Sequence, residues 1–231
     1  MFDNSSLVIF QFYHSQFESN IGRLARQLTC YEKSEISHFK NTEKSINFII
    51  SRYFSRLLLG KFNNVESSEI SYVLGEFGKP VALDSSSSPL RVQFNISHSN
   101  KMCLLAFSKA AGLGVDVEFV DGSIDINELA LVYFAMNERR CLEGLQGQAL
   151  IVEFYRLWTL KEAYLKSIGV GLNVDLSEIS SVDIMSSGSR LLDTLDLDNS
   201  NYQAAIACNN GSIAVNSLSA DESHAFIDGL L

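Results

Sequence analysis

The residues with the clearest chemical potential are two acidic side chains separated by one residue. Asp116 and Glu118 lie within Gly114–Phe119, where the sequence GVDVEF places apolar residues at every second position. This alternation predicts a β-strand, in which side chains two apart share a face at a spacing of about 6.5–7 Å. Such carboxylates repel each other unless a cation lies between them, and Mg²⁺ binds carboxylate and phosphate oxygens together. The alternative is an ordinary polar strand face that points to solvent.

A third acidic residue lies on a predicted helix, one turn before a lysine. Glu162 and Lys166 belong to the segment WTLKEAYLK at 158–166, and their spacing of four places them on one helix face. A surface pair of this kind also stabilises a helix by about 0.2–0.5 kcal/mol, which is the plain structural alternative. Gly169 and Gly171 follow at once. One glycine is explained as the helix C-cap, whereas a second would let backbone approach a ligand closely.

A histidine between two serines forms another candidate binding motif. His98 follows Ser97 in FNISHS at 94–99, and it is best interpreted as a donor to an anion, assisted by the serine hydroxyls. A hydrolase based on Ser97 and His98 is a weaker alternative, because the sequence lacks the G-x-S-x-G nucleophile elbow. The other alternative is a polar turn after a strand.

A short turn motif, Gly78-Lys79-Pro80, lies further upstream. Glycine permits an unusual backbone conformation there and proline makes it rigid. Alone, this motif indicates a turn and no particular chemistry.

The elements expected to position these residues are helices and strands in mixed order, which favours an α+β fold. Strands are predicted at Ser6–Tyr13, Gln93–Ile96, Cys103–Phe107, Gly114–Phe119, Ile179–Met185, Tyr202–Cys208 and Ser212–Leu218. Helices are predicted at Ile21–Cys30, Glu32–Phe39, Glu43–Leu59, Ile126–Leu142 and Leu150–Ser167. Gly60 is expected to end the third helix, and Asp84–Pro89 is expected to be a surface loop.

Composition excludes several classes of protein. The chain has 231 residues, of which 46% are apolar, so it can form a sizeable core as one or two domains. Its net charge of −9 argues against a general nucleic-acid binder. The most apolar stretch, Phe48–Leu59, contains Arg52 and Arg56, so no membrane span is expected. The N-terminus has no basic signal region and the four cysteines are dispersed, which predicts a soluble cytoplasmic protein with reduced thiols.

The charge is unevenly distributed along the chain. Residues 1–113 contain 12 basic and 9 acidic residues, whereas residues 114–231 contain 6 basic and 18 acidic residues. A basic half that faces an acidic half could bind an anionic ligand together with a divalent cation. The alternative is a soluble protein with an acidic C-terminal surface.

The motifs gain specificity from their order, which is G-K-P, F-N-I-S-H-S, G-V-D-V-E and W-x-x-K-E-A-x-x-K followed by G-x-G. Together they resemble the 4′-phosphopantetheinyl transferases of the surfactin-synthetase-activating, Sfp-like type, over residues 78–172. The resemblance implies a monomeric pseudo-dimer of two similar α+β halves with the active site in the cleft between them. The halves would be residues 1–113, on the adenine and 3′-phosphate side of coenzyme A, and residues 114–231, on the metal side.

The resemblance also implies roles for single residues. Asp116, Glu118 and Glu162 match the carboxylates that hold Mg²⁺, and Glu162 and Lys166 match the catalytic pair. The coenzyme A contacts implied in this way are Lys33, Gly78, Lys79, Pro80, Ser97, His98 and Lys166. Ser97 and His98 would lie near the 3′-phosphate, Gly78, Lys79 and Pro80 beside the adenine, and Lys166 near the phosphates.

The N-terminal half departs from the family pattern. The family often has several basic residues before the first long helix, and this chain offers Lys33, Lys40 and Lys44 there. Ile36 and Asn47 occupy positions where further basic or polar contacts are expected. The segment after Gly171 resembles the region that contacts the carrier protein.

The implied reaction moves the 4′-phosphopantetheine arm of coenzyme A to a serine of an apo acyl or peptidyl carrier protein and releases adenosine 3′,5′-bisphosphate. Either Glu162 or a metal-bound water could accept the serine proton, because a serine hydroxyl does not ionise alone near neutral pH. The main alternative is a non-catalytic module that binds coenzyme A or a carrier protein. The presence of all three carboxylates counts against it.

Overall fold

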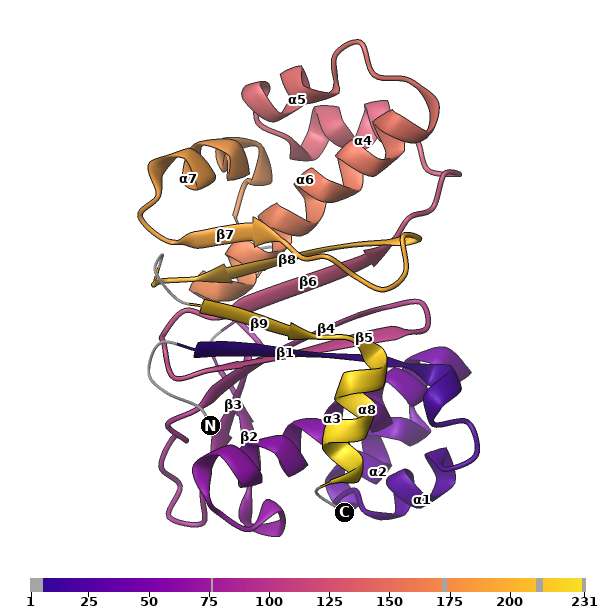
Figure 1. The fold of residues 1–231 in the computed structure, drawn as a ribbon, viewed down its shortest axis with the longest axis vertical. Coiled ribbons are helices and arrows are strands. Elements are labelled where there is room, and N and C mark those ends of the chain that lie inside the picture. The colour runs from indigo at the N-terminus through magenta and orange to yellow at the C-terminus, as the bar shows by residue number, and fades with distance from the viewer. Residues whose placement is uncertain (1–5, 76, 172–173, 211–213, 230–231) are drawn as a thin grey trace.

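The computed structural model describes residues 6–75, 77–171, 174–210 and 214–229, and it forms the α+β fold that the sequence predicts. The described strands form a four-stranded sheet in the order β4-β5-β1-β9, a two-stranded sheet β2-β3 and a three-stranded sheet β6-β8-β7 (Figure 1). Their bounds are β1 Ser6–Tyr13, β2 Ser71–Leu74, β3 Pro80–Leu83, β4 Gln93–Ser99, β5 Met102–Ser108, β6 Gly114–Phe119, β7 Leu191–Thr194, β8 Tyr202–Cys208 and β9 Ala214–Leu218.

Helices cover the outer faces of the two larger sheets (Figure 1). Their bounds are α1 Ile21–Arg26, α2 Cys30–Ser37, α3 Thr42–Asn63, α4 Ile126–Tyr133, α5 Met136–Leu142, α6 Gly147–Ile168, α7 Ser181–Ser187 and α8 Ala220–Asp228. Short 3₁₀ turns lie at His14–Gln16, Ser67–Glu69 and Leu176–Glu178. None of the helices in the described part of the chain is long and apolar enough to span a membrane.

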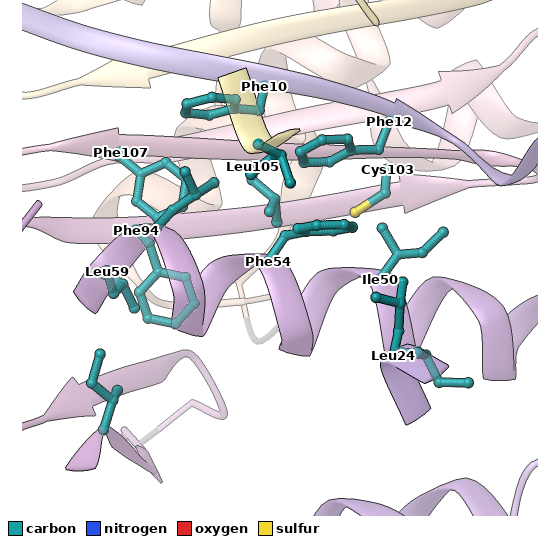
Figure 2. Packing of buried hydrophobic residues seen from close by; sticks show 14 of the residues in the cluster. Phe10, Phe12, Leu24, Ile50, Phe54, Leu59, Phe94, Cys103, Leu105 and Phe107 are labelled. Carbon is teal, nitrogen blue, oxygen red and sulfur yellow. The ribbon is translucent and has the colours of Figure 1, made fainter. Parts of the chain in front are cut away.

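The two halves follow a similar plan. Each starts with a strand, continues through two short helices into a helix of 22 residues, and returns to further strands; the long helices are α3 and α6. In the first half, α3 packs on the four-stranded sheet, and Figure 2 shows the aromatic residues that fill this layer. Phe12 and Phe54 stack there with ring centroids 4.8 Å apart. The packed sheet and helix therefore support α3, whose Phe48, Ser51 and Arg52 line the pocket described below.

In the second half, α6 lies close against the three-stranded sheet because small residues face it. Ala163 of α6 packs with Ala205 and Ala207 of β8 in one buried cluster. A Cβ added to Gly114 of β6 would lie 2.1 Å from the carbonyl oxygen of Ala163. The glycine of the G-V-D-V-E motif thus brings β6 and α6 together, and these two elements carry the predicted carboxylates.

The two larger sheets also pack face to face. Leu7, Leu104 and Val117 belong to one buried cluster that draws on β1, β5, β6 and β8. At one side of this sandwich, the edge strands β4 and β6 meet. The halves are therefore joined by an apolar layer as well as by the polar contacts described below.

The last described segment returns to the first half, although the sequence analysis counted it with the second. β9 pairs in parallel with β1, with Ser6 opposite Ala214 and Phe10 opposite Leu218. α8 follows β9 (Figure 1). The centroid of its Phe226 ring lies 5.3 Å from that of Phe10 in β1. The chain end therefore ties the two halves together.

Several element predictions were wrong. The segment Ile179–Met185 is not a strand, because Ser180 caps the helix α7 through the amide of Asp183. The single helix predicted over Ile126–Leu142 is two helices, separated at residues 134–135, where the backbone is extended.

Gly60 does not end the first long helix. α3 continues to Asn63, and Asn64 ends it in the left-handed conformation. Gly60 instead allows close packing, since a Cβ there would lie 2.9 Å from the carbonyl oxygen of Val65. The hairpin β2-β3, the strand β7 and the helix α8 were absent from the prediction.

Candidate active site

The three predicted carboxylates line one pocket between the halves together with His98 and Lys166. Its volume is about 340 Å³, and it is lined by Phe48, Ser51, Arg52, Pro80, Ile96, Ser97, His98, Asp116, Glu118, Glu162 and Lys166. These residues come from α3, β3, β4, β6 and α6. The structure therefore brings together residues that stand more than one hundred positions apart in sequence.

Asp116 is the most deeply buried of the three carboxylates. Its residue is only 3% exposed, so the strand face does not point to solvent. Oδ1 accepts hydrogen bonds from Lys166 Nζ at 2.6 Å and from Ser97 Oγ at 2.9 Å. Oδ2 is buried and has no hydrogen-bond partner among the described residues. One oxygen of Asp116 is thus held by the protein and the other is available to a ligand.

Glu118 and Glu162 are half-buried and carry shifted pKa values. Burial, reinforced by the nearby charge of Asp116, raises the pKa of Glu118 to about 7. Ser99 Oγ opposes this shift in part, since it donates to Glu118 Oε2 at 2.8 Å. Burial and the charge of Asp116 also raise the pKa of Glu162. The mutual repulsion expected from the sequence is therefore present in the folded chain.

The three carboxylates have suitable chemistry for a divalent cation. Carboxylate oxygens are the ligands that Mg²⁺ prefers, and the unpartnered Oδ2 of Asp116 is the kind of buried acceptor that a cation would satisfy. Among the described residues, no three His, Cys, Asp or Glu side chains are gathered closely enough to hold a metal ion as they stand. A single metal ion bound by all three carboxylates would therefore require movement of at least one of these side chains.

The wall of the pocket around His98 of β4 and Arg52 of α3 is basic. Partial dehydration in the pocket lowers the pKa of His98, and the charges of Lys166, His14 and Lys44 lower it further. Arg52 of α3 lines the same pocket, and its guanidinium lies over the rings of Phe48 and Tyr72. Several cationic groups around His98 make this wall suitable for an anion.

Arg52 was missed by the sequence analysis, which treated it only as a charge that interrupts an apolar stretch. Its Nη1 is buried without a hydrogen-bond partner among the described residues. The sequence does contain a signal: Phe48 and Arg52 are four apart on a predicted helix, so they share one face. That face could not be connected with His98 before the helix was placed on the sheet.

Besides Lys166, the predicted coenzyme A residues Ser97, Lys79 and Lys33 already have partners within the protein. The hydroxyl of Ser97 accepts from Lys166 Nζ and from the amide of Val117 and donates to Asp116. Lys79 Nζ donates to the carbonyl oxygens of Leu113 at 2.7 Å and Lys166 at 2.8 Å. Lys33 Nζ donates to Arg26 O and does not line the pocket.

The G-K-P motif is a turn that leads into β3. Gly78 has a φ of +83°, and Pro80 is the first residue of β3 and lines the pocket. Burial lowers the pKa of Lys79 to about 8. Its ammonium connects the two halves, because it binds Leu113 at the end of the first half and Lys166 in the second half.

Asn47 explains one departure from the family pattern. Its amide oxygen lies 2.8 Å from His14 Nε2, and its Nδ2 donates to the carbonyl oxygen of Asn100 at 2.9 Å. Asn100 lies in the turn between β4 and β5 and has a φ of +50°. Asn47 therefore supports the turn next to His98 and does not supply charge.

The lysine beside Glu162 has a structural role. Lys161 is 1% exposed and its Nζ lies 2.6 Å from Glu138 Oε2. It also donates to the carbonyl oxygens of Leu176 at 2.7 Å and of Tyr133 at 3.1 Å. This buried ion pair fastens α5 and the segment after α6 to α6, and so fixes the helix that presents Glu162 and Lys166.

The two final glycines of the W-x-x-K-E motif both adopt left-handed backbone. Gly169 ends α6 with a φ of +75°, and Gly171 follows with a φ of +57°. The second glycine is therefore explained by conformation. Residues 172–173, in the segment expected to contact a carrier protein, lie outside the described residues.

The two-half α+β fold, with carboxylates and cationic groups around one pocket, agrees with the protein family that two family models identify. A model of the 4′-phosphopantetheinyl transferase superfamily matches residues 112–216, and a model of the N-terminal part of 4′-phosphopantetheinyl transferases matches residues 15–110. The chain is a member of the 4′-phosphopantetheinyl transferase superfamily.

Several bacterial relatives are named 4′-phosphopantetheinyl transferases. The Nostoc 4′-phosphopantetheinyl transferase HetI is 31% identical over 157 residues, which cover 68% of this chain and 66% of the relative. The Bacillus subtilis transferase Sfp is 26% identical over 149 residues, which cover 64% and 63%. The Aneurinibacillus migulanus transferase gsp is 28% identical over 139 residues, which cover 60% and 55%. The matched part of this chain thus spans 55% to 66% of these relatives.

Proposed function

We propose that this protein transfers the 4′-phosphopantetheine arm of coenzyme A to a serine of an apo acyl or peptidyl carrier protein. The observation that carries the proposal is the common pocket of Asp116, Glu118, Glu162, Lys166 and His98 between the halves. Membership in a superfamily of 4′-phosphopantetheinyl transferases supports it.

Asp116, Glu118 and Glu162 would hold Mg²⁺ in this pocket. Bound Mg²⁺ would neutralise diphosphate charge and orient the reacting phosphate. Asp116 can contribute Oδ2 without breaking an existing contact, because Oδ1 alone is engaged by Lys166 and Ser97. The site would thus combine Asp116, whose Oδ1 is already held, with the carboxylates of Glu118 and Glu162.

In the reaction, the carrier serine oxygen forms a bond to the β-phosphorus of coenzyme A, and the bond from that phosphorus to the bridging oxygen breaks. The bridging oxygen leaves with adenosine 3′,5′-bisphosphate. Lys166 would stabilise the charge that develops on this leaving phosphate. Positioning and charge neutralisation are the main requirements of such a transfer.

Glu162 is our candidate acceptor for the serine proton. Its pKa is raised by burial and by Asp116, and a base works best when its pKa approaches the working pH. It lies one helical turn from Lys166, so a proton acceptor and a leaving-group stabiliser would share one face of α6.

The basic wall would hold the 3′-phosphate of coenzyme A. His98 and Arg52 support this assignment because both line the pocket, and the charge of Lys44 acts on His98. The Ser97 hydroxyl is fully engaged by Lys166, Val117 and Asp116, which argues against a Ser97–His98 hydrolase.

The test is a mass measurement on a carrier protein. The chain is incubated with coenzyme A, Mg²⁺ and an apo-carrier, and parallel samples contain a chelator or lack coenzyme A. We expect the carrier to gain the mass of one phosphopantetheine arm only in the complete mixture. A carrier that binds but gains no mass would favour the non-catalytic module.

A further inference from the structure

The edge of β6 that faces the first half is satisfied by side chains and not by a neighbouring strand. Its amides at Val115, Val117 and Phe119 donate to Asn95 Oδ1 at 2.8 Å, Ser97 Oγ at 3.2 Å and Ser99 Oγ at 3.0 Å, respectively. Buried edge amides need acceptors, and three alternate residues of β4 supply them. We call these three contacts the β4–β6 seam.

The type of β4 side chain at each seam contact depends on the residue that precedes the β6 amide. Gly114, which precedes Val115, has no side chain, so the amide needs only an acceptor, and Asn95 provides one. Asp116 and Glu118 precede the other two amides. There the partner must accept from an amide and also donate to a carboxylate, which a hydroxyl can do.

Both seam serines meet this requirement. Ser97 Oγ donates to Asp116 Oδ1 at 2.9 Å, and Ser99 Oγ donates to Glu118 Oε2 at 2.8 Å. Each serine therefore binds a carboxylate and the amide of the next residue together. The side-chain orientation of each carboxylate is thereby fixed relative to its own strand.

We propose that Ser97 and Ser99 are positioning residues, which hold one oxygen of Asp116 and of Glu118 and leave the other oxygen free for Mg²⁺. This inference rests on the proposed function, because that function supplies the metal. Groups that hydrogen-bond to metal ligands commonly account for a 10- to 100-fold difference in metal affinity. The F-N-I-S-H-S motif would then serve two tasks: its serines orient the metal carboxylates, whereas His98 faces the anion.

The test compares Ser99→Ala with the matched variant Asn95→Ala. Each change removes one seam contact to an amide, but only Ser99→Ala also releases a carboxylate. The melting temperature of each full-length variant is measured as a function of Mg²⁺ concentration, and its rise gives the apparent affinity for Mg²⁺ without any assay of activity.

We expect both variants to melt below the wild type in the absence of Mg²⁺. Ser99→Ala should weaken the apparent Mg²⁺ affinity about 10- to 100-fold, whereas Asn95→Ala should leave it unchanged. Ser99→Thr, which keeps the hydroxyl, should restore the affinity. Equal Mg²⁺ affinity in wild type and Ser99→Ala, or an equal loss in Asn95→Ala, would overturn the proposal.

Asp116→Asn distinguishes a failure of the positioning role from a failure of the metal site itself. If it loses the Mg²⁺-dependent rise while Ser99→Ala keeps it, the positioning role is wrong and the carboxylate site stands. If Asp116→Asn binds Mg²⁺ as the wild type does, the metal site and the positioning role both fail.

Discussion

The Asp116–Lys166 ion pair is unequal in its access to water. The side chain of Asp116 is 4% exposed and that of Lys166 is 27% exposed. If Lys166 is removed, a buried carboxylate loses its cation, whereas Lys166 can reach water if Asp116 is removed. The two removals should therefore lower the free energy of unfolding by different amounts, which is not expected of a surface ion pair.

We therefore predict that Lys166→Ala destabilises the metal-free protein by about 1–3 kcal/mol, and that Asp116→Ala costs less. Chemical denaturation of both variants in a chelator measures the two free energies. Equal costs, or a larger cost for Asp116→Ala, would contradict the burial on which this prediction rests.

His98 gives a prediction about ligand discrimination. A charge-assisted hydrogen bond to phosphate is worth about 1.5–3 kcal/mol. His98→Ala should therefore lower the affinity for coenzyme A by roughly 10- to 150-fold. The affinity for dephospho-coenzyme A, which lacks the 3′-phosphate, should change little. Because the pKa of His98 is lowered, the discrimination should grow as pH falls toward that pKa. Calorimetry with both ligands checks this, and an equal loss for both would move His98 away from the 3′-phosphate.

Glu118 gives a prediction about pH. Its pKa in the folded protein is about 7, against an ordinary value of 4.5, so the folded state binds the proton more tightly than the unfolded state. The stability that this proton confers is complete below 4.5 and is lost as pH rises through about 7. In a chelator, the wild type should therefore lose stability relative to Glu118→Gln across this interval. If the unfolding free energies of the two proteins change in the same way with pH, the raised pKa of Glu118 is refuted.

Among the elements, the contact between β6 and α6 depends most directly on one residue. Gly114→Ala would place a Cβ 2.1 Å from the Ala163 carbonyl oxygen, so strand and helix must separate. We predict a loss of about 1–3 kcal/mol in unfolding free energy, together with weaker Mg²⁺ binding. The control is Gly22→Ala in α1, where a Cβ would meet nothing within 4 Å. Thermal melting of both variants compares them, and equal stability would show that β6 and α6 are not in such close contact.

The elements that carry the carboxylates could be predicted because their signals are local. β6 was predicted from its period of two and α6 from its period of 3.6, and the structure confirms both elements. The helix α7 was mistaken for a strand because Ile179, Val182 and Ile184 are β-formers, whereas the decisive contact was the cap by Ser180. Capping competes with propensity in short segments.

The site was predictable only where its residues share an element. The pairs Asp116–Glu118 and Glu162–Lys166 follow from spacing within one strand or one helix. The contact of Ser97 with Lys166 joins residues 69 positions apart, so no local pattern could reveal it. For the same reason, the place of Arg52 on the basic wall became visible only when α3 was packed on its sheet.

Over the whole molecule, the site depends on contacts that join the two halves. The seam connects β4 to β6, and Lys79 connects the turn before β3 to the carbonyl oxygens of Leu113 and Lys166. β9 and α8 close the arrangement from the other side, since they pack on β1 (Figure 1). The basic first half and the acidic second half are thereby held with the pocket between them.

We propose that the three carboxylates between the halves form the centre of a transferase. Single-turnover transfer to an apo-carrier at saturating coenzyme A and Mg²⁺ tests it most directly, with Glu162→Gln beside the wild type. Glutamine preserves the shape but removes a metal charge and the proposed base, so the rate should fall at least about 100-fold while the melting temperature stays close to that of the wild type. A normal rate in Glu162→Gln would contradict a catalytic role of these carboxylates.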